Sequence, residues 1–489
     1  MTSTPTADPG ATQPWSSRTL RVNNERVLLE RLRADGAASR AHLARVTGLS
    51  KPTVSAALGN LEHAGLVRET GETAVASGRG RSAVLYEADP TAGYVIAVDI
   101  NRPLIRVALA DLDGTIRGRR ELPTVVGPQH TDPAAAADAI VAAAGRISRE
   151  MVAEAGLEWN RVVHTVVGTP GVFDPATDAV RYAGALPGWG QNGMVERLRR
   201  ELGTGLAVHN DANLAALGEH TYGAGRGCRL LVYLMVGIGV GAGIVVDGRV
   251  FTGAHGAAGE VGYLPFPPGE RGHGGQGGGH GGHGGESGPD SGHDGQGSES
   301  GPGGGHSGQG SESGPDSGHG DQGDRGNQGI DHSDRRPGHS PSVCEPADAE
   351  APHTAFLQRG TLDAAAGGSA VTALAAAAGT RDARDPDAVF DAARAGDAAA
   401  LSAVHAEAGR LAHAVASIAA TLDPELVILG GEIGAHADLL LDPLYDVLET
   451  LTPLRPPVVA AALGRDAVLL GAITTALSTA REYVFECRL

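Results

Sequence analysis

The pattern of hydrophobic and polar positions divides the chain into a helical N-terminal segment and a longer body in which strands and helices alternate. In the N-terminal segment, apolar residues recur at helical spacing over residues 23–34. A second helix is predicted at 40–46, because Ser39 is a good N-cap, and a third helix follows Ser50. Pro52 falls in the first turn of the third helix, where a missing N–H costs nothing. Three short helices therefore precede the body.

The body is predicted to be an α/β structure, because apolar runs bounded by glycine alternate with alanine-rich segments of helical length. Strands are predicted at 94–100, 104–114, 161–171 and 425–431, two strands joined by a Gly-rich turn at 228–250, and helices at 134–155, 192–202, 211–220 and 397–421. Such alternation is typical of sheets covered by helices. A chain of 489 residues exceeds one compact core, so more than one domain is expected.

Two segments lack the apolar residues that a folded core needs. Residues 1–17 are rich in Thr, Pro, Ala and Ser and carry no apolar stretch of the kind that a secretory signal peptide has. Residues 267–351 consist almost wholly of Gly, Ser, His, Asp, Gln and Glu, and the octapeptide GQGSESGP occurs there at 295–302 and 308–315. We expect a disordered lead and a disordered insertion, since neither segment can offset the entropy of ordering.

Charge is distributed unevenly along the chain. The formal net charge is −18, whereas residues 18–82 hold eleven Arg and Lys against six Asp and Glu, which gives this segment +5 and leaves −23 for the remainder. A basic head on an acidic body indicates that only the head contacts nucleic acid. Cys228, Cys344 and Cys487 are too far apart in sequence for a metal knuckle or a redox pair, and no apolar run reaches the length of a membrane span. A cytoplasmic protein without a membrane partner is expected.

The third predicted helix has the composition of a helix that enters the major groove of DNA. Its apolar positions, Val54, Leu58 and Leu61, would face inward. Its small polar residues would face outward: Ser50, Lys51, Thr53, Ser55 and Asn60. Hydroxyl, amide and ammonium groups on a slim helix can reach base edges and phosphates. We therefore predict DNA contacts from Ser50, Lys51, Thr53 and Ser55.

A wing is predicted to follow this helix. Residues 66–68 and 83–86 are expected to form its two strands, and the connecting loop carries Arg79 and Arg81 between glycines. Paired arginines on a glycine-rich tip suit a narrow minor groove. Helices and wing together predict a winged helix-turn-helix domain over residues 18–88. The alternative is a three-helix protein-binding module whose charges are only solvated.

Three sequence motifs in the body carry a family resemblance. They are GIGVGAGIVVDGRVFTGAHGAAGEVG at 237–262, HNDANLAALGE at 209–219 and LDPELVILGGEI at 422–433. With them the chain resembles the ROK family, which groups repressors and sugar kinases on one fold. The resemblance implies a two-lobed, actin-like (sugar kinase or ribonuclease H-like) domain over 93–489, interrupted by 267–351. A winged head before this domain is the arrangement of the family's repressors, which its kinases usually lack.

The same resemblance implies a sugar site. Asn210 and Asp211 match an Asn-Asp pair that hydrogen-bonds sugar hydroxyls, and in the kinases this Asp is the catalytic base. Glu260 and Asp363 match two further carboxylates that contact the sugar, and the turn at 168–171 matches one that lines the sugar cleft. A carboxylate beside an amide can orient a hydroxyl and accept its proton. For Asp211, N-capping of the following helix is an independent role that could hold as well.

The nucleotide side departs from the kinase pattern. Kinases of the family open with a strand that ends in Asp-x-Gly-Gly-Thr, whereas this chain has Asp-Ile-Asn-Arg-Pro at 99–103. Bulky side chains and a proline replace the glycines whose backbone amides would cradle phosphate. A second turn, Gly-Ile-Gly at 237–239, is better preserved but offers no hydroxyl. We therefore predict no catalytic residue and no cofactor.

The metal site of the family has also changed. Tyr263 stands where many members have a His, and the segment 354–363 has no cysteine where they have a Cys-x-Cys-Gly-x-x-Gly-Cys run. A tetrahedral zinc site cannot be built without those thiolates. Eight histidines in the insertion recur at no fixed spacing, so no metal site is predicted there either.

The sequence thus predicts a transcriptional repressor that binds operator DNA as a homodimer or homotetramer and responds to a sugar or sugar derivative. The first rival is an active ATP-dependent sugar kinase with an added DNA-binding head. The second is a regulator without a small ligand, whose body serves only dimerisation or a partner protein. The first phosphate loop speaks against the kinase, and Asp211, Glu260 and Asp363 speak against the second rival.

Replacing both Arg79 and Arg81 with Ala should weaken DNA binding and reduce its dependence on salt, because two phosphate or minor-groove contacts disappear. Lys51→Ala should weaken binding as well. Gel-shift titrations at several salt concentrations measure both effects. An unchanged affinity in the double variant would show that the wing does not contact DNA.

Overall fold

The computed structural model describes residues 17–74, 83–124, 132–184, 186–203, 205–266 and 360–489. By its internal contacts the chain divides into two units, residues 1–269 with 354–489 and residues 270–353. Residues 1–16 of the predicted lead, the predicted wing tip with Arg79 and Arg81, and the predicted insertion at 267–351 lie outside the described residues. Ser17, which was predicted to belong to the disordered lead, is instead the first residue of a helix. In the described part, no helix is both long and apolar enough to span a membrane.

The head is a winged helix-turn-helix. It contains α1 (Ser17–Asp35), α2 (Arg40–Thr47), α3 (Lys51–His63) and an antiparallel sheet in the order β1-β3-β2, formed by β1 (Ala38–Ser39), β2 (Val67–Ala74) and β3 (Ala83–Ala88). Ser39 and Ser50 each accept a hydrogen bond from the backbone N–H three residues further on, which confirms both predicted caps. Val54, Leu58 and Leu61 are fully buried, as predicted.

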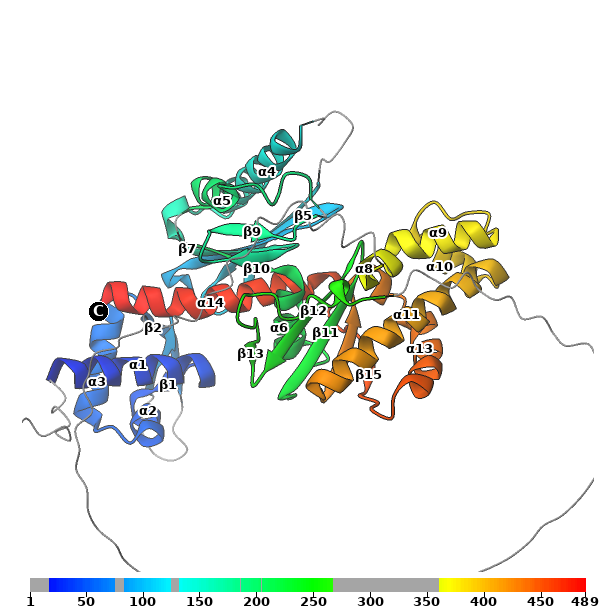
Figure 1. Cartoon of the computed structure of the whole chain (residues 1–489). Helices are drawn as coiled ribbons and strands as arrows, with labels where there is room; N and C mark the ends of the chain where they lie inside the picture. The colour runs from blue at the N-terminus through cyan, green and yellow to red at the C-terminus, as the bar shows by residue number, and fades with distance from the viewer. Residues whose placement is uncertain (1–16, 75–82, 125–131, 185, 204, 267–359) are drawn as a thin grey trace, which may run out of the picture. The chain divides into compact units, whose positions relative to one another are not determined.

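The first lobe is a five-stranded sheet in the order β10-β7-β4-β5-β6. Its elements are η1 (Pro90–Ala92), β4 (Tyr94–Ile100), β5 (Leu104–Asp111), β6 (Ile116–Pro123), α4 (Pro133–Glu154), η2 (Trp159–Arg161), β7 (Val162–Thr169), β8 (Val172–Asp174), β9 (Ala179–Arg181), α5 (Met194–Leu202) and β10 (Leu206–Asn210). The helices α4 and α5 cover one face of this sheet (Figure 1) and bury a core around Ile96, Val107 and Trp189.

The second lobe is also a five-stranded sheet, in the order β13-β12-β11-β14-β15. It contains β11 (Leu230–Val236), β12 (Val240–Val246), β13 (Arg249–Val250), η3 (Val261–Tyr263), α8 (Leu362–Ala365), α9 (Gly368–Ala378), α10 (Pro386–Arg394), α11 (Ala398–Leu422), β14 (Leu426–Gly430), α12 (Gly431–Gly434), α13 (Ala437–Leu451) and β15 (Val458–Ala460). Its outer core forms between the sheet and helices α9, α10, α11 and α13. Two sheets of this kind form the actin-like arrangement that the resemblance implied.

Two helices join the lobes and the head. Helix α6 (Asp211–Tyr222) packs along α14 (Ala467–Arg488), which follows η4 (Gly464–Asp466). One continuous hydrophobic cluster contains Leu58 of the head, Phe485 and Ile473 of α14, Leu214 of α6, and residues of both sheets such as Val95. Figure 1 shows α14 as the long red helix beside α6. The core of the head is therefore continuous with the core of the body.

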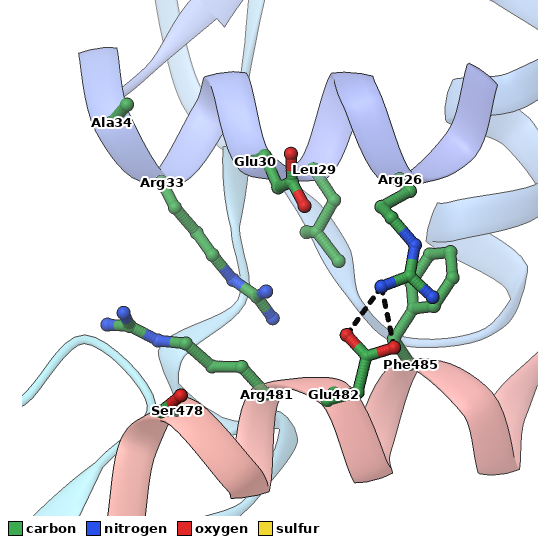
Figure 2. A pocket seen from close by; sticks show the side chains of 9 residues that line it. All are labelled: Arg26, Leu29, Glu30, Arg33, Ala34, Ser478, Arg481, Glu482 and Phe485. Atoms are coloured by element: carbon green, nitrogen blue, oxygen red, sulfur yellow. Dashed lines mark hydrogen bonds and ion pairs between the residues drawn. The ribbon is translucent and has the colours of Figure 1, made fainter. Parts of the chain in front are cut away.

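Polar contacts add to this junction. Arg26 of α1 donates a hydrogen bond to Glu482 of α14 (2.6 Å), and its guanidinium lies 4.6 Å from the ring centre of Phe485 (Figure 2). Arg488 donates to the backbone oxygens of Ala64 (3.2 Å) and Gly65 (3.0 Å) in the turn after α3. These contacts fix the head to the C-terminal half of α14.

The two edges of the segment at 267–359 lie side by side. The N–H of Phe266 donates to the carbonyl of Gly360 (3.2 Å), and Pro265 forms an isolated bridge with Thr361. A shorter connection between these two positions is therefore sterically feasible.

Deleting residues 270–340 should leave folding and DNA binding largely intact. The deletion shortens the connection between Phe266 and Gly360 about fourfold, which changes the free energy of loop closure by only about 1.2 kcal/mol. The paired edges at Phe266 and Gly360 stay in place. Melting temperature and gel-shift affinity of the deleted chain measure the effect. A large fall in melting temperature would mean that the segment contributes to the fold.

Candidate functional site

The exposed face of α3 is the candidate DNA-reading surface. Ser50, Lys51 and Ser55 are exposed, and Thr53 is half-buried. The hydroxyls of Ser50 and Thr53 lie 2.8 Å apart, so both also serve the N-cap of α3. Asn60 is exposed as predicted, but its amide donates to Oε1 of Glu25 (2.6 Å) and so ties α3 to α1. The DNA contacts of this face, and those of Arg79 and Arg81 outside the described residues, stay predictions.

Asn210 sits where β10 ends and α6 begins. Its Oδ1 accepts from the N–H of Asn213 (3.1 Å), and its Nδ2 donates to the carbonyl of Gly171 (3.1 Å). Asn210 is therefore the N-cap of α6, whereas the sequence had suggested that Asp211 could cap this helix. The Asn210 side chain thus holds the turn at 168–171 against the start of α6. That this turn lines a sugar cleft stays a prediction.

Asp211 is the first residue of α6 and is 7% exposed. Its Oδ1 accepts from the N–H of Ala212 (2.8 Å). Burial raises the pKa of Asp211 to about 7, and the charges of Asp99 and Glu260 add to this rise. Buried carboxyls with strongly raised pKa values are concentrated at functional sites.

Glu260 and Asp363 lie near this carboxyl. Burial raises the pKa of Glu260 to about 7, with a further contribution from the charge of Asp363. Oδ1 of Asp363 accepts from the N–H of Val240 (2.9 Å), so Asp363 also fixes the turn between β11 and β12. The structure thus brings Asp211, Glu260 and Asp363 into one electrostatically linked group, and their contacts with a sugar stay predictions.

Two tyrosines beside this group were not predicted as site residues. The rings of Tyr182 and Tyr263 meet edge to face with centres 5.6 Å apart. Burial, followed by the charges of Glu260 and Asp363, raises the pKa of the Tyr263 phenol. Tyr182 is 46% exposed and has a positive φ of 58°, an unusual backbone for a bulky residue. The only sequence signal was that Tyr263 replaces a family histidine; nothing in the sequence indicated Tyr182.

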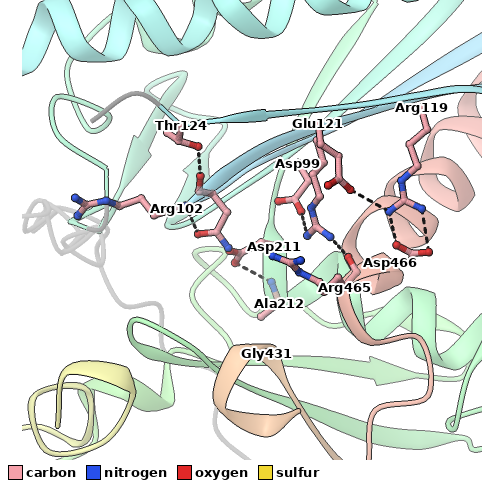
Figure 3. A network of polar contacts seen from close by, with 12 residues as sticks. Asp99, Arg102, Arg119, Glu121, Thr124, Asp211, Ala212, Gly431, Arg465 and Asp466 are labelled. Carbon is pink, nitrogen blue, oxygen red and sulfur yellow. Dashed lines mark hydrogen bonds and ion pairs between the residues drawn. The ribbon is translucent and has the colours of Figure 1, made fainter. Parts of the chain in front are cut away.

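The first phosphate turn is filled by its own hydrogen bonds (Figure 3). The N–H of Asn101 donates to the carbonyl of Leu104 (3.2 Å), the N–H of Arg102 donates to Oδ1 of Asn101 (2.8 Å), and Pro103 has no N–H. The side chain of Thr124 donates to the carbonyl of Asn101 (2.5 Å). None of these three backbone positions therefore offers an N–H to a phosphate.

The carboxylate beside this turn already forms an ion pair with an arginine of the protein. Asp99 is the second-last residue of β4, is fully buried, and pairs with the guanidinium of Arg106 from β5. The same guanidinium also donates to the carbonyl of Arg465. Desolvation raises the pKa of Asp99, and Arg106 opposes this rise. Next to this pair, Arg119 of β6 binds Asp466 before α14. These ion pairs link the first lobe to the base of α14 (Figure 3).

The second turn, at 237–239, also forms hydrogen bonds within the protein. The N–H of Gly237 donates to the carbonyl of Gly239 (2.9 Å), and the N–H of Gly368 donates to the carbonyl of Gly237 (2.8 Å). A Cβ at Gly239 would lie 2.3 Å from Oδ1 of Asp363, so packing against this carboxylate requires glycine there. Over the described residues, no three His, Cys, Asp or Glu side chains group in a way that could hold a metal ion.

Comparisons with known proteins identify the family. A sequence model of the ROK family matches residues 95–284 and 325–479, which is more than half of the chain. The chain therefore belongs to the ROK family. A model of the MarR family matches residues 26–75, which cover the three helices of the head from within α1 onward.

Curated relatives include both repressors and kinases. The chain is 29% identical over 233 residues to a putative xylose repressor of Caldicellulosiruptor sp. (strain Rt8B.4), covering 48% of this chain and 56% of that protein. It is 24% identical over 237 residues to the xylose repressor of Bacillus subtilis (strain 168), covering 48% and 58%. It is 30% identical over 166 residues to the glucokinase of Streptomyces coelicolor, covering 34% and 47%. The matched parts thus span about half of these relatives.

Solved structures show the same fold. A ROK family transcriptional regulator, described as a homologue of the E. coli MLC protein, aligns with a TM-score of 0.62 at 20% identity and covers 95% of this chain and 99% of that one. A ROK family glucokinase from Streptomyces griseus in complex with glucose and AMPPNP aligns with a TM-score of 0.51 at 20% identity, covering 79% and 100%. The predicted fold, a winged head followed by an actin-like body, is confirmed.

The pKa of Asp211 predicts a measurable pH dependence. Between its ordinary pKa of 3.8 and about 7, only the folded state keeps the proton, so this residue lowers the free energy of unfolding as pH rises through that window. Asp211→Asn should therefore gain about 1 to 4 kcal/mol over the wild type between pH 4 and pH 7.5.

Urea denaturation of both proteins at the two pH values gives this difference, with Asp446→Asn at an exposed position of α13 as the control. An equal difference between Asp211→Asn and wild type at both pH values would contradict the raised pKa.

Proposed function

We propose that the chain is a DNA-binding transcriptional repressor whose actin-like body binds a sugar or sugar derivative and thereby changes operator affinity. The observation that carries this proposal is the shared hydrophobic core of head and body, which places a DNA-reading domain on the helix that packs against the candidate sugar site. The proposed limits are 18–88 for the head and 93–489 for the body. The relatives named xylose repressors support the same function.

The candidate sugar site has the polarity that a sugar requires. Asn210, Asp211, Glu260 and Asp363 supply donors and acceptors for hydroxyls, and the exposed Tyr182 ring offers an apolar surface for a sugar face. The names of the relatives make D-xylose the first sugar to try. A bound hydroxyl can take a hydrogen bond from the protonated Asp211 carboxyl or donate to its ionised form.

Helices α6 and α14 connect this site to the head. A Cβ at Gly471 of α14 would lie 1.8 Å from the carbonyl oxygen of Leu214, and one at Gly218 of α6 would lie 2.3 Å from that of Ala467. The two backbones are therefore in direct contact, one turn after Asp211. A sugar that shifts the start of α6 must also shift α14, whose far end is packed into the head through Phe485. Allosteric coupling of this kind is typically worth 5- to 150-fold in affinity.

Sugar phosphorylation is the second candidate function, because relatives include glucokinases and Asp211 is placed at the start of α6 as a catalytic base would be. The hydrogen bonds within the turn at 101–103 and the pairing of Asp99 with Arg106 argue against it. Phosphoryl transfer depends on positioning and charge stabilisation of the donor, and this turn offers neither. We therefore propose that Asp211 binds the sugar without catalysing its phosphorylation.

The remaining partners follow from the proposed function. Helix-turn-helix heads usually bind two half-sites related by a two-fold axis, so we propose a homodimer, or a homotetramer built from dimers, acting on operator DNA in the cytoplasm. No cofactor is needed for this activity.

The direct test selects an operator from random-sequence DNA and then screens sugars, D-xylose first, for one that raises the melting temperature of the chain. That sugar should change the Kd for the operator at least fivefold. Asp211→Ala should abolish this change while the sugar-free Kd stays within twofold, and the exposed Asp446→Ala serves as the control.

Selection of no DNA sequence, or a sugar effect that survives in Asp211→Ala, would contradict the proposal. ATP turnover with a panel sugar that disappears in Asp211→Ala would assign the chain to the kinases instead.

A further inference from the structure

A cavity of 370 Å³ lies between α1 of the head and α14 (Figure 2). Leu29 and Phe485 line it with apolar surface, and Arg33, Ser478 and Arg481 line it with polar groups. Its volume falls within the range of sites for small molecules, and its walls combine apolar surface with converging donors. It shares no lining residue with the candidate sugar site around Asp211.

Two arginines reach into this cavity from opposite helices, and their side chains extend past one another. Arg33 extends from α1 and Arg481 from α14 (Figure 2). Nε of Arg481 donates to the carbonyl of Leu112 (2.8 Å), which fixes the guanidinium plane. Burial, and then the charge of Arg481, lowers the pKa of Arg33 to about 10, so Arg33 stays charged at neutral pH. Within the described residues, neither guanidinium lies within ion-pair distance of a carboxylate.

Three nearby carboxylates, those of Asp113, Glu30 and Glu482, offset part of the repulsion on Arg33 through their charges. Glu482 is bound to Arg26 (2.6 Å), and Glu30 is exposed at the rim. Asp113 acts on both arginines through its charge, but in the described part of the chain it forms no ion pair with either of them. Burial raises the pKa of the Asp113 carboxyl. Two partly buried like charges therefore line a space large enough for a small molecule.

We propose that this cavity is a binding site for a small phosphate-class oxyanion, held between the guanidinium groups of Arg33 and Arg481. Each guanidinium is a planar group of donors that matches the geometry of phosphate oxygens, and the Ser478 hydroxyl adds another donor. A bound anion also removes the repulsion between the two arginines. The occupant is either inorganic phosphate or a phosphorylated small molecule whose organic part lies against Leu29 and Phe485.

The position of the site gives the anion a role at the junction. It bridges α1, which belongs to the head, and α14, which packs on α6. An anion that joins these helices stabilises their contact, so its concentration is a second input beside the sugar. Only this regulatory consequence rests on the proposed function; anion binding itself does not.

The test measures the melting temperature of the full chain in sodium phosphate and in sodium chloride at equal ionic strength. The wild type should show a phosphate-specific rise that follows saturable binding. Arg33→Gln should weaken phosphate binding at least fivefold, and the Arg33→Gln, Arg481→Gln double variant should abolish the rise. Arg31→Gln, on the same helix but paired with Asp35 and outside the cavity, should keep it.

Two further readouts complete the test. In chloride, Arg33→Gln should melt no lower than the wild type, because it removes one of two opposed like charges; a folding defect would lower it. Titration calorimetry with inorganic phosphate, ribose 5-phosphate and ribose then distinguishes the two possible occupants. Tenfold tighter binding of ribose 5-phosphate than of inorganic phosphate indicates a phosphorylated metabolite. Equal binding of the two indicates free phosphate. Absence of a phosphate-specific rise in the wild type, or its persistence in the double variant, would overturn the proposal.

Discussion

The rest of the structure depends on the packing of α14, which contacts α6, the first-lobe strands β4 and β7, and the head. One side of the helix meets α6 so closely that only glycine fits at Gly471. Its C-terminal half buries Val484 and Phe485 in the same cluster as the leucines of the head. Burial of such side chains contributes roughly 1.5 to 3 kcal/mol each, so the head gains much of its docking energy from this one helix. Any motion of α14 is therefore shared by the head and the body.

The two sides of the region between the lobes differ in how their polar groups are bonded. On the sugar side, Asp211 and Glu260 are buried carboxyls with raised pKa values and groups oriented for a polar ligand. On the nucleotide side, Asp99 is paired with Arg106 and the turn at 101–103 bonds to itself. The side that binds nucleotide in the family's kinases is thus occupied here by internal cross-links. Those cross-links also fix the base of α14 through Arg465 and Asp466.

Local features were predictable from the sequence, whereas tertiary partners were not. The caps Ser39 and Ser50, the strand at 94–100 and the helix at 211–220 follow from residue type and periodicity, and the structure confirms them. Helix α14 was not among the predicted helices, and its N-cap makes no side-chain hydrogen bond that marks its start. Helix α13 contains Pro443, which masked its helical pattern.

The candidate site shows the same division. The motif indicated the buried carboxyls, but sequence spacing could not show that Asn210 rather than Asp211 caps α6. It could not show that Arg106 returns from the neighbouring strand to pair with Asp99, since β4 and β5 pair by register in space. Tyr182 and Arg481 have no motif at all; their places depend on packing between segments that are distant in sequence.

The central claim is that α14 transmits sugar binding to the head, and Arg488→Ala tests it most directly. This change removes the hydrogen bonds from α14 to Ala64 and Gly65, in the turn that follows the C-terminal end of α3, and the one to Ala92. None of these contacts involves a residue of the candidate sugar site. The measurement is the ratio of the operator Kd with and without the effector sugar, compared with Arg455→Ala, whose guanidinium pairs only with Glu449 among the described residues. We expect Arg488→Ala to bind the sugar normally yet to bring this ratio close to one. A ratio equal to that of the wild type, with sugar binding intact, would contradict it.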